Sequence, residues 1–224
     1  LVGDRARSMW VSTFHSACVR ILRREAALLG YTNSFTIYDQ SDSLRLVTLV
    51  MRDLNLDAKR YAPRAVAALI SQAKNELLGP ADYLNQSKDH FQEIVAQVFA
   101  IYQKRLSAAN SMDFDDLIAK SVEVMQRFPE CRAKYRSRFK HILVDEYQDT
   151  NHAQYILVRE LTGSLEDGTP PAELCVVGDA DQSIYAFRGA TIRNIMQFEL
   201  DYPSATTILL EQNYRSTQNI LNAA

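Results

Sequence analysis

The sequence of 224 residues has little of what holds small or secreted proteins together. Its three cysteines are odd in number and far apart, and its four histidines do not combine with them at the spacing of a zinc site. No apolar run approaches the roughly 18 residues that cross a bilayer, and residues 1–10 lack the layout of a signal peptide. We therefore expect reduced thiols, a cytoplasmic globular protein and no membrane partner.

An excess of either charge is lacking as well. With 25 Lys and Arg against 27 Asp and Glu, the net charge of −2 predicts no strong overall attraction to nucleic acid. A sum hides patches, however, and basic side chains gather in residues 1–30 and in residues 130–140. On composition alone, such patches are typical of solvated helix faces.

A phosphate-binding P-loop is also missing. Its pattern is G-x-x-x-x-G-K-[ST], in which backbone N–H groups surround the phosphates and the lysine reaches the outermost ones. None of the seven glycines is followed by lysine. Gly163 and Gly168 have the right spacing, but a threonine follows the second of them. The segment between them holds Glu166 and Asp167, which would repel phosphate, so we reject it as a P-loop.

What the sequence does contain is a set of short apolar runs. Four segments have the composition of strands: residues 10–14, 141–145, 174–178 and 206–211. Three helical stretches lie beside or between them: residues 15–29, 151–162 and 191–200. Strands that are apolar on both faces and alternate with helices indicate a parallel sheet covered on both sides.

The middle of the chain has almost entirely helical periodicity. Apolar stripes at helical spacing recur over residues 39–128, and Pro63 suits the first position of a helix, where a missing N–H costs nothing. Asp113, followed three residues later by Asp116, has the pattern of a helix cap. The predicted fold class is therefore α/β, a parallel sheet covered by helices, with an all-helical insertion at residues 39–112.

Two acidic residues end the apolar run at residues 141–145. Ligands of open parallel sheets bind beyond the carboxyl ends of the strands, which is where Asp145 and Glu146 fall. Adjacent carboxylates repel each other, so the pair indicates a bound cation, and Mg²⁺ typically takes one or two carboxylates plus phosphates and water. The second acid can then orient or deprotonate an attacking water. An acidic turn that merely caps the next helix fits the pattern equally well.

Five segments together resemble the ordered motifs of superfamily 1A DNA helicases, in particular the UvrD/PcrA/Rep group. They are STFHS (12–16), MDFDDL (112–117), VDEYQDTN (144–151), VGDADQSIYAFRGA (177–190) and LEQNYRST (210–217). The resemblance covers nearly the whole chain. It implies a RecA-like parallel sheet and ATP-driven 3′→5′ movement along single-stranded DNA, with the strands of a duplex separated on the way.

The resemblance also implies a domain organisation. Residues 1–38 and 113–224 would belong to the first RecA-like domain, 1A, and residues 39–112 would form its helical insertion, 1B. The P-loop would then precede residue 1, and the second RecA-like domain would follow residue 224. We accordingly expect the chain to be an internal fragment that is inactive by itself and of which the sheet is only partial.

The resemblance further implies the residues of the ATP site. Asp145 and Glu146 take the positions of the Mg²⁺ ligand and the catalytic acid/base, which makes ATP and Mg²⁺ the expected cofactors. Gln182 would contact the γ-phosphate and report its presence to the DNA side. Tyr214 would stack near the adenine, and Arg215 would contact the γ-phosphate. A fixed cation at that point stabilises the charge of a phosphoryl-transfer transition state.

A DNA-binding side is expected in the same way. Thr13 and His15 match family positions that line the single-strand path. Tyr185, Phe187 and Arg188 bring two aromatic rings and a cation into four residues, and bases stack on such rings with little sequence preference. The family usually has tryptophan where Phe187 stands, so the platform here is smaller. The expected partners are single-stranded DNA, duplex DNA, ATP and repair proteins, near the bacterial nucleoid.

Other functions stay open at this point. A helicase–nuclease subunit of the AddA/RecB kind shares these motifs, and a fragment can also act only as a DNA- or partner-binding module. A non-helicase P-loop ATPase is disfavoured by the aromatic stretch IYAFRG beside a phosphate sensor. The basic segments, residues 20–24 and 130–140, become candidates for a DNA-facing surface, which would make binding strongly salt-dependent.

Overall fold

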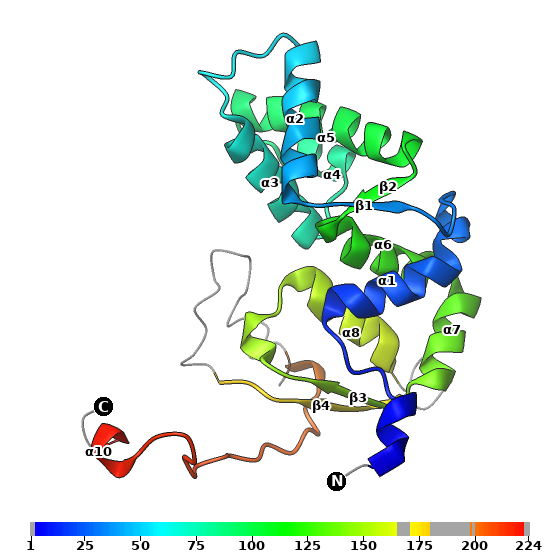
Figure 1. Ribbon diagram of the computed structural model, residues 1–224, viewed down its shortest axis with the longest axis vertical. Helices are drawn as coiled ribbons and strands as arrows, with labels where there is room; N and C mark the ends of the chain where they lie inside the picture. Colours follow the sequence, from blue (N-terminus) through cyan, green and yellow to red (C-terminus); the bar gives the residue numbers. More distant parts are fainter. Residues whose placement is uncertain (1–2, 165–170, 180–197, 199, 222–224) are drawn as a thin grey trace.

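The computed structural model describes residues 3–164, 171–179, 198 and 200–221. Over these residues the chain is mixed α/β, mostly helical with short parallel sheets, which confirms the predicted fold class (Figure 1). Among the described helices, none combines the length and the apolar character needed to span a membrane.

One end of the molecule is built from helices alone (Figure 1). They are α2 (Gln40–Asp53), α3 (Pro63–Asn75), α4 (Pro80–Gln86) and α5 (His90–Ala108). Asp39 caps α2, because its side chain accepts from the backbone N–H groups of Ser41 and Asp42, and Pro63 opens α3 as predicted. These helices share a core of their own, formed by Val47, Val50, Met51, Val66, Ile70, Ala73, Ile94, Val95, Val98, Phe99, Tyr102 and Leu106.

A short parallel pair of strands brackets these helices. Strand β1 (Thr36–Tyr38) precedes α2 and β2 (Ser111–Asp113) follows α5, with Ile37 opposite Met112. We did not predict this pair from the sequence. A strand of three residues is too short to show a recognisable hydrophobic pattern, and these two strands pair residues that are far apart in the chain.

The other end combines helices with a second sheet. Its helices are α1 (Phe14–Glu25), α6 (Phe114–Arg127), α7 (Pro129–Arg138) and α8 (His152–Thr162), with the short helices η1 (Gly3–Ser8), η2 (Ala26–Leu29), η3 (Tyr147–Asp149) and α10 (Gln218–Leu221). Helix α6 packs against α1, α7 and α8. Gly30 ends η2 with a φ of 82°, and Asp113 and Asp116 form the predicted capping box of α6.

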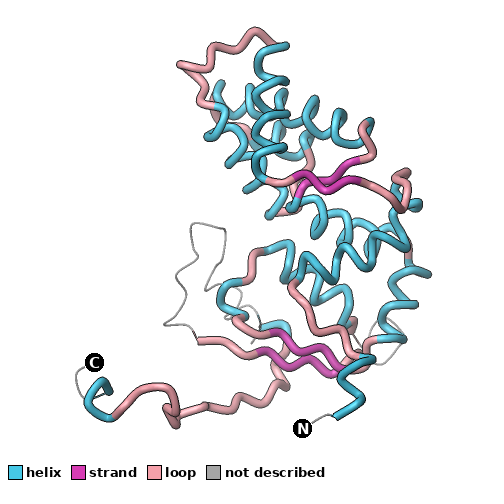
Figure 2. The backbone as a smooth tube through the Cα atoms, viewed as in Figure 1, coloured by secondary structure: helices cyan, strands magenta, loops and turns pink. Residues whose placement is uncertain are grey.

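The second sheet confirms the predicted parallel pairing. Strands β3 (His141–Val144) and β4 (Glu173–Val176) lie side by side with Leu143 opposite Cys175 (Figure 2). Their carboxyl ends therefore meet at the same edge of the sheet, and the residues that follow both strands come close together.

Two predicted strands are wrong. Residues 10–14 are not a strand: Trp10 instead packs its ring against Phe139, with the ring centroids 5.0 Å apart. Residues 206–211 are irregular, and Ile208, Leu209 and Leu210 are largely exposed. A strand forms only where its backbone groups find a neighbour, and nothing in the described part of the chain pairs with these residues. Most of the helix predicted at 191–200 lies outside the described residues.

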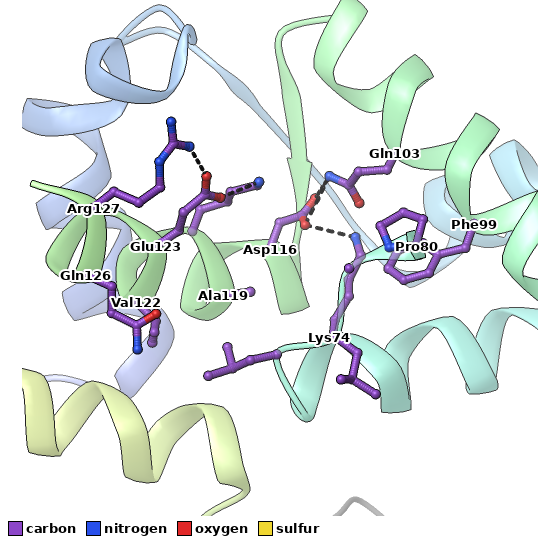
Figure 3. Close-up of a pocket in the computed structure, with 14 residues that line it drawn as sticks. Lys74, Pro80, Phe99, Gln103, Asp116, Ala119, Val122, Glu123, Gln126 and Arg127 are labelled. Atoms are coloured by element: carbon purple, nitrogen blue, oxygen red, sulfur yellow. Dashed lines mark hydrogen bonds and ion pairs between the residues drawn. The ribbon is translucent and has the colours of Figure 1, made fainter. Parts of the chain in front are cut away.

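A buried ion cluster joins the two ends. Lys74 of α3 places its Nζ 2.6 Å from Asp113 Oδ2 and 2.9 Å from Asp116 Oδ1, and Tyr102 donates to Asp113 at 2.7 Å. Figure 3 shows Lys74 and Gln103 both pointing toward Asp116, beside a pocket of about 290 Å³. Burial opposes the charge on Lys74, but the Asp116 and Asp113 carboxylates outweigh it and raise the pKa of its amine.

Candidate functional site

The site predicted from the sequence lies at the turn after β3. Asp145 and Glu146 follow Val144 directly, and both are exposed. Glu146 has a left-handed backbone, with a φ of 50°, and its N–H donates to Asp145 Oδ1 at 3.0 Å. A non-glycine residue in this region costs roughly 1–3 kcal/mol and persists only where its surroundings hold it. The two predicted acids are therefore brought together at the carboxyl end of the strand.

Backbone hydrogen bonds fix this turn against the chain that leaves β4. Val177 N–H donates to Val144 O at 2.8 Å, and Tyr147 N–H donates to Val177 O at 2.9 Å. The acidic pair consequently lies next to the first residues of the 177–190 stretch. Of the two segments that the sequence assigned to one ATP site, residues 144–151 and the described residues 177–179 are therefore neighbours at this edge.

A buried glutamine, which the sequence reasoning did not single out, ties the two segments together. Gln148 is 1% exposed, and its Nε2 donates to Glu146 Oε2 at 2.7 Å. Its Oε1 accepts from the backbone N–H of Asp179 at 3.0 Å. Gly178 permits this approach, because a Cβ there would stand 2.8 Å from Gln148 Oε1. The only signal in the sequence was a polar residue next to the acidic pair.

The acidic turn offers carboxylates of the kind that a magnesium ion takes as ligands. Two exposed carboxylates, those of Asp145 and Glu146, stand at the end of the strand, and Mg²⁺ is commonly held by one or two carboxylates together with phosphates and water. Across the described residues no three side chains of the His, Cys, Asp or Glu type gather into a metal cluster.

Among the described residues, no hydrogen bond or ion pair joins Tyr214 or Arg215, two other residues predicted for the ATP site, to the acidic pair. Gln182 lies outside the described residues. Tyr214 is 91% exposed and Arg215 is exposed as well, on the irregular segment that follows residue 205. The side chain of Asn213 accepts from the N–H of Arg215, which makes a local turn. The roles given to these three residues stay predictions.

The residues predicted for the DNA side divide in the same way. Tyr185, Phe187 and Arg188 lie outside the described residues. Thr13 caps α1 through its side chain, which accepts from the N–H of Ser16 at 3.3 Å. Its structural role is therefore clear, and a role on a DNA path stays a prediction.

His15 has an aromatic neighbour that the sequence reasoning passed over. The ring of Phe114 meets His15 edge to face, with centroids 5.6 Å apart, and Phe114 is 49% exposed. Burial lowers the pKa of His15, which favours the neutral ring. A half-exposed phenylalanine at the start of a helix, beside a predicted DNA contact, is a candidate stacking surface.

The two basic segments meet around one tryptophan. The guanidinium carbons of Arg20, Arg24 and Arg138 lie 4.6, 5.9 and 5.2 Å from the centroid of the Trp10 ring. Arg23 instead donates to the backbone oxygens of Asn33 and Phe35, so it stabilises the fold. A DNA-facing role for this basic surface remains a prediction.

Comparison with known proteins identifies the family. Residues 1–203 match the family described as "UvrD/REP helicase N-terminal domain". All of the chain aligns with ATP-dependent DNA helicase UvrD1 of Mycobacterium tuberculosis (strain CDC 1551 / Oshkosh) at 64% identity and of Mycobacterium leprae (strain TN) at 59%. It aligns with ATP-dependent DNA helicase PcrA of Staphylococcus aureus (strain Mu50 / ATCC 700699) at 50%, and it spans 30% of each of these relatives. The chain belongs to the UvrD/REP helicase family.

Proposed function

We propose that the chain is part of an ATP-dependent DNA helicase that moves 3′→5′ along single-stranded DNA and separates duplexes. The observation that carries the proposal is the turn of Asp145 and Glu146, held against the first residues of the 177–190 stretch by two backbone hydrogen bonds. The names of the relatives, which are ATP-dependent DNA helicases, support the same activity.

In this proposal Asp145 would hold Mg²⁺. Glu146 would orient the water that attacks the γ-phosphate and would take up its proton, while the bond from the γ-phosphorus to the β-phosphate oxygen breaks and ADP leaves. A bound Mg²⁺ would neutralise charge on the phosphate oxygens. Gln182 and Arg215 would contact the γ-phosphate, and Tyr214 would stack near the adenine. The chain lacks a P-loop pattern, so the phosphate cradle would come from another part of the protein.

The proposal includes the domain organisation expected from the sequence. Residues 39–112 form the insertion 1B, and residues 1–38 and 113–224 belong to domain 1A. Two separate hydrophobic cores support this division, one within α2, α3 and α5 and the other around α6. A place in bacterial DNA repair or replication restart, in the cytoplasm near the nucleoid, is part of the same proposal.

The function is tested on a full-length protein that contains this chain. We expect ATP hydrolysis that single-stranded DNA stimulates, and strand separation of a duplex with a 3′ tail but not of one with a 5′ tail. DNA binding without stimulated hydrolysis would contradict the proposal and favour a binding module. Degradation of the displaced strand would favour the helicase–nuclease reading instead.

The DNA side is tested at Phe114. Because stacking of a base on an aromatic ring contributes about 1–3 kcal/mol, Phe114→Ala should weaken single-stranded DNA binding by about 5- to 150-fold. Phe114→Trp should retain binding, since it keeps an aromatic face. Fluorescence anisotropy of a labelled oligonucleotide at fixed salt measures the affinity.

A matched control for Phe114 is available on α4. Leu84 is a similarly exposed apolar residue, at 48%, and Leu84→Ala should leave the affinity unchanged. If Phe114→Ala binds single-stranded DNA as tightly as the unmodified protein, the surface beside His15 is not part of the DNA path.

A further inference from the structure

We propose that Gln148 is a positioning residue for ATP hydrolysis, whose side-chain amide holds the Glu146 carboxylate and the backbone at Asp179 in one fixed arrangement. This inference rests on the proposed function, because it takes Glu146 as the group that acts on the attacking water. It adds a residue to which no role in the site has been assigned.

The hydrogen bonds of Gln148 leave one orientation for its amide. Nε2 faces the Glu146 carboxylate at 2.7 Å, and Oε1 faces the Asp179 N–H at 3.0 Å. The flipped amide would set its oxygen against the carboxylate and its N–H group against another N–H. Gln148 therefore binds both partners at the same time: the Glu146 carboxylate is the acceptor and the Asp179 N–H is the donor.

Few other side chains could replace Gln148 in this place. Glutamate keeps the size but cannot donate when ionised, and leucine can neither donate nor accept. The residue is almost fully buried, so a lost bond leaves a polar group without a partner in a confined space. The backbone at Gly178 packs closely against this side chain, because a Cβ at Gly178 would stand 2.8 Å from Gln148 Oε1.

Gln148 is placed to restrict both the side chain of Glu146 and the backbone of the chain after β4. Glu146 holds a left-handed backbone at an exposed turn, and its side chain would otherwise sample several rotamers. The bond to Gln148 engages one carboxylate oxygen and so limits where the other can lie. Asp179 stands three residues before Gln182, the predicted γ-phosphate contact, so the same amide also fixes where that stretch begins.

The experiment separates the two bonds of Gln148 in a full-length protein that contains this chain. Gln148→Leu removes both bonds, whereas Gln148→Glu retains an acceptor for the Asp179 N–H and loses the donor to Glu146. We expect both variants to lower kcat for DNA-stimulated ATP hydrolysis by about 10- to 100-fold, with the KM for ATP within about 3-fold, because a misplaced reacting group lowers the rate of the chemical step.

The matched control is Gln126→Leu. The Gln126 amide also donates to a carboxylate, that of Glu160 at 3.3 Å, but it lies on α6 away from the turn after β3. We expect its kcat to equal that of the unmodified protein. Gly178→Ala is an independent probe: its new Cβ would press on Gln148 Oε1, so it should reproduce the loss in kcat without changing any hydrogen-bonding side chain.

The outcomes distinguish this inference from the proposed function. Failure of the unmodified protein to hydrolyse ATP in the presence of DNA would overturn both. If the unmodified protein hydrolyses ATP and Gln148→Glu retains its kcat, the function stands and the positioning role of Gln148 is overturned. A raised KM at unchanged kcat would also overturn it, since that pattern reports lost ground-state binding.

Discussion

Replacing Glu146 by glutamine is expected to lower kcat for ATP hydrolysis by about 10²- to 10⁴-fold while ATP still binds. The amide keeps the size of the side chain and can still contact water, but it cannot take up a proton. Glu146 is exposed at the end of β3 and engages Gln148 through one oxygen, so the substitution leaves the hydrophobic core untouched. Steady-state hydrolysis and nucleotide binding by a full-length protein that contains this chain measure the two effects.

The control for this prediction is Glu93→Gln. Glu93 lies in the first turn of α5, is exposed and contacts His90 at 3.4 Å. Helix α5 belongs to the helical end of the molecule, whereas the acidic turn follows β3 at the other end (Figure 1). We expect hydrolysis within about 2-fold of the unmodified rate, because Glu93 has no contact with the acidic turn and most surface substitutions change stability by only about 0.5 kcal/mol. Should Glu146→Gln hydrolyse ATP as fast as Glu93→Gln, Glu146 is not the general base, and the acidic turn has another role.

The sequence predicted well the features that local physics decides. A capping pair three residues apart located the start of α6 at Asp113, and Pro63 located the start of α3. The end of η2 at Gly30 follows from a backbone conformation that glycine adopts without strain. Each of these signals acts within about four residues, so no knowledge of the rest of the chain was needed.

Features that depend on distant partners were predicted poorly. The β1–β2 pair joins Thr36 to Ser111, and neither segment has a pattern of its own. Residues 206–211 have the composition of a buried strand, but composition does not supply a neighbouring strand. The acidic pair was found because two adjacent carboxylates are costly without a cation. Gln148 was missed because its role depends on a hydrogen bond with Asp179, which is 31 residues away in the sequence. It also depends on Gly178, which allows the two residues to approach.

The largest effect on stability is expected at Lys74. Its side chain is 3% exposed and lies between the carboxylates of Asp113 and Asp116. Lys74→Met keeps the length of the side chain but removes the charge that offsets two buried carboxylates. Breaking a buried ion pair from one side costs about 3–5 kcal/mol, and we expect at least that loss in the free energy of unfolding. Urea denaturation followed by circular dichroism measures it.

The carboxylates around Lys74 give this prediction a pH dependence. In Lys74→Met, burial and mutual repulsion would raise the pKa values of Asp113 and Asp116 above those of the unfolded chain. The folded state then binds more protons than the unfolded state, so the variant should gain stability as pH falls. Burial raises the pKa of neighbouring Asp115 to about 6 already in the unmodified protein, so Asp115 does not cause the difference but marks the pH range in which buried carboxyls of this cluster titrate. The difference in the free energy of unfolding between the variant and the unmodified protein should therefore become smaller from pH 8 to pH 5.

Two further variants separate charge from packing at this cluster. Lys120→Met removes a partly exposed lysine that pairs with Glu123, and it should cost no more than about 1 kcal/mol. Adding Asp116→Asn to Lys74→Met removes one uncompensated charge and should restore part of the lost stability, which shows as a positive coupling in the double-mutant cycle. The effects of Lys74→Met and Asp116→Asn on the free energy of unfolding could instead be additive and independent of pH. The cluster would then stabilise the junction of α3 and α6 by packing, and its charges would not contribute.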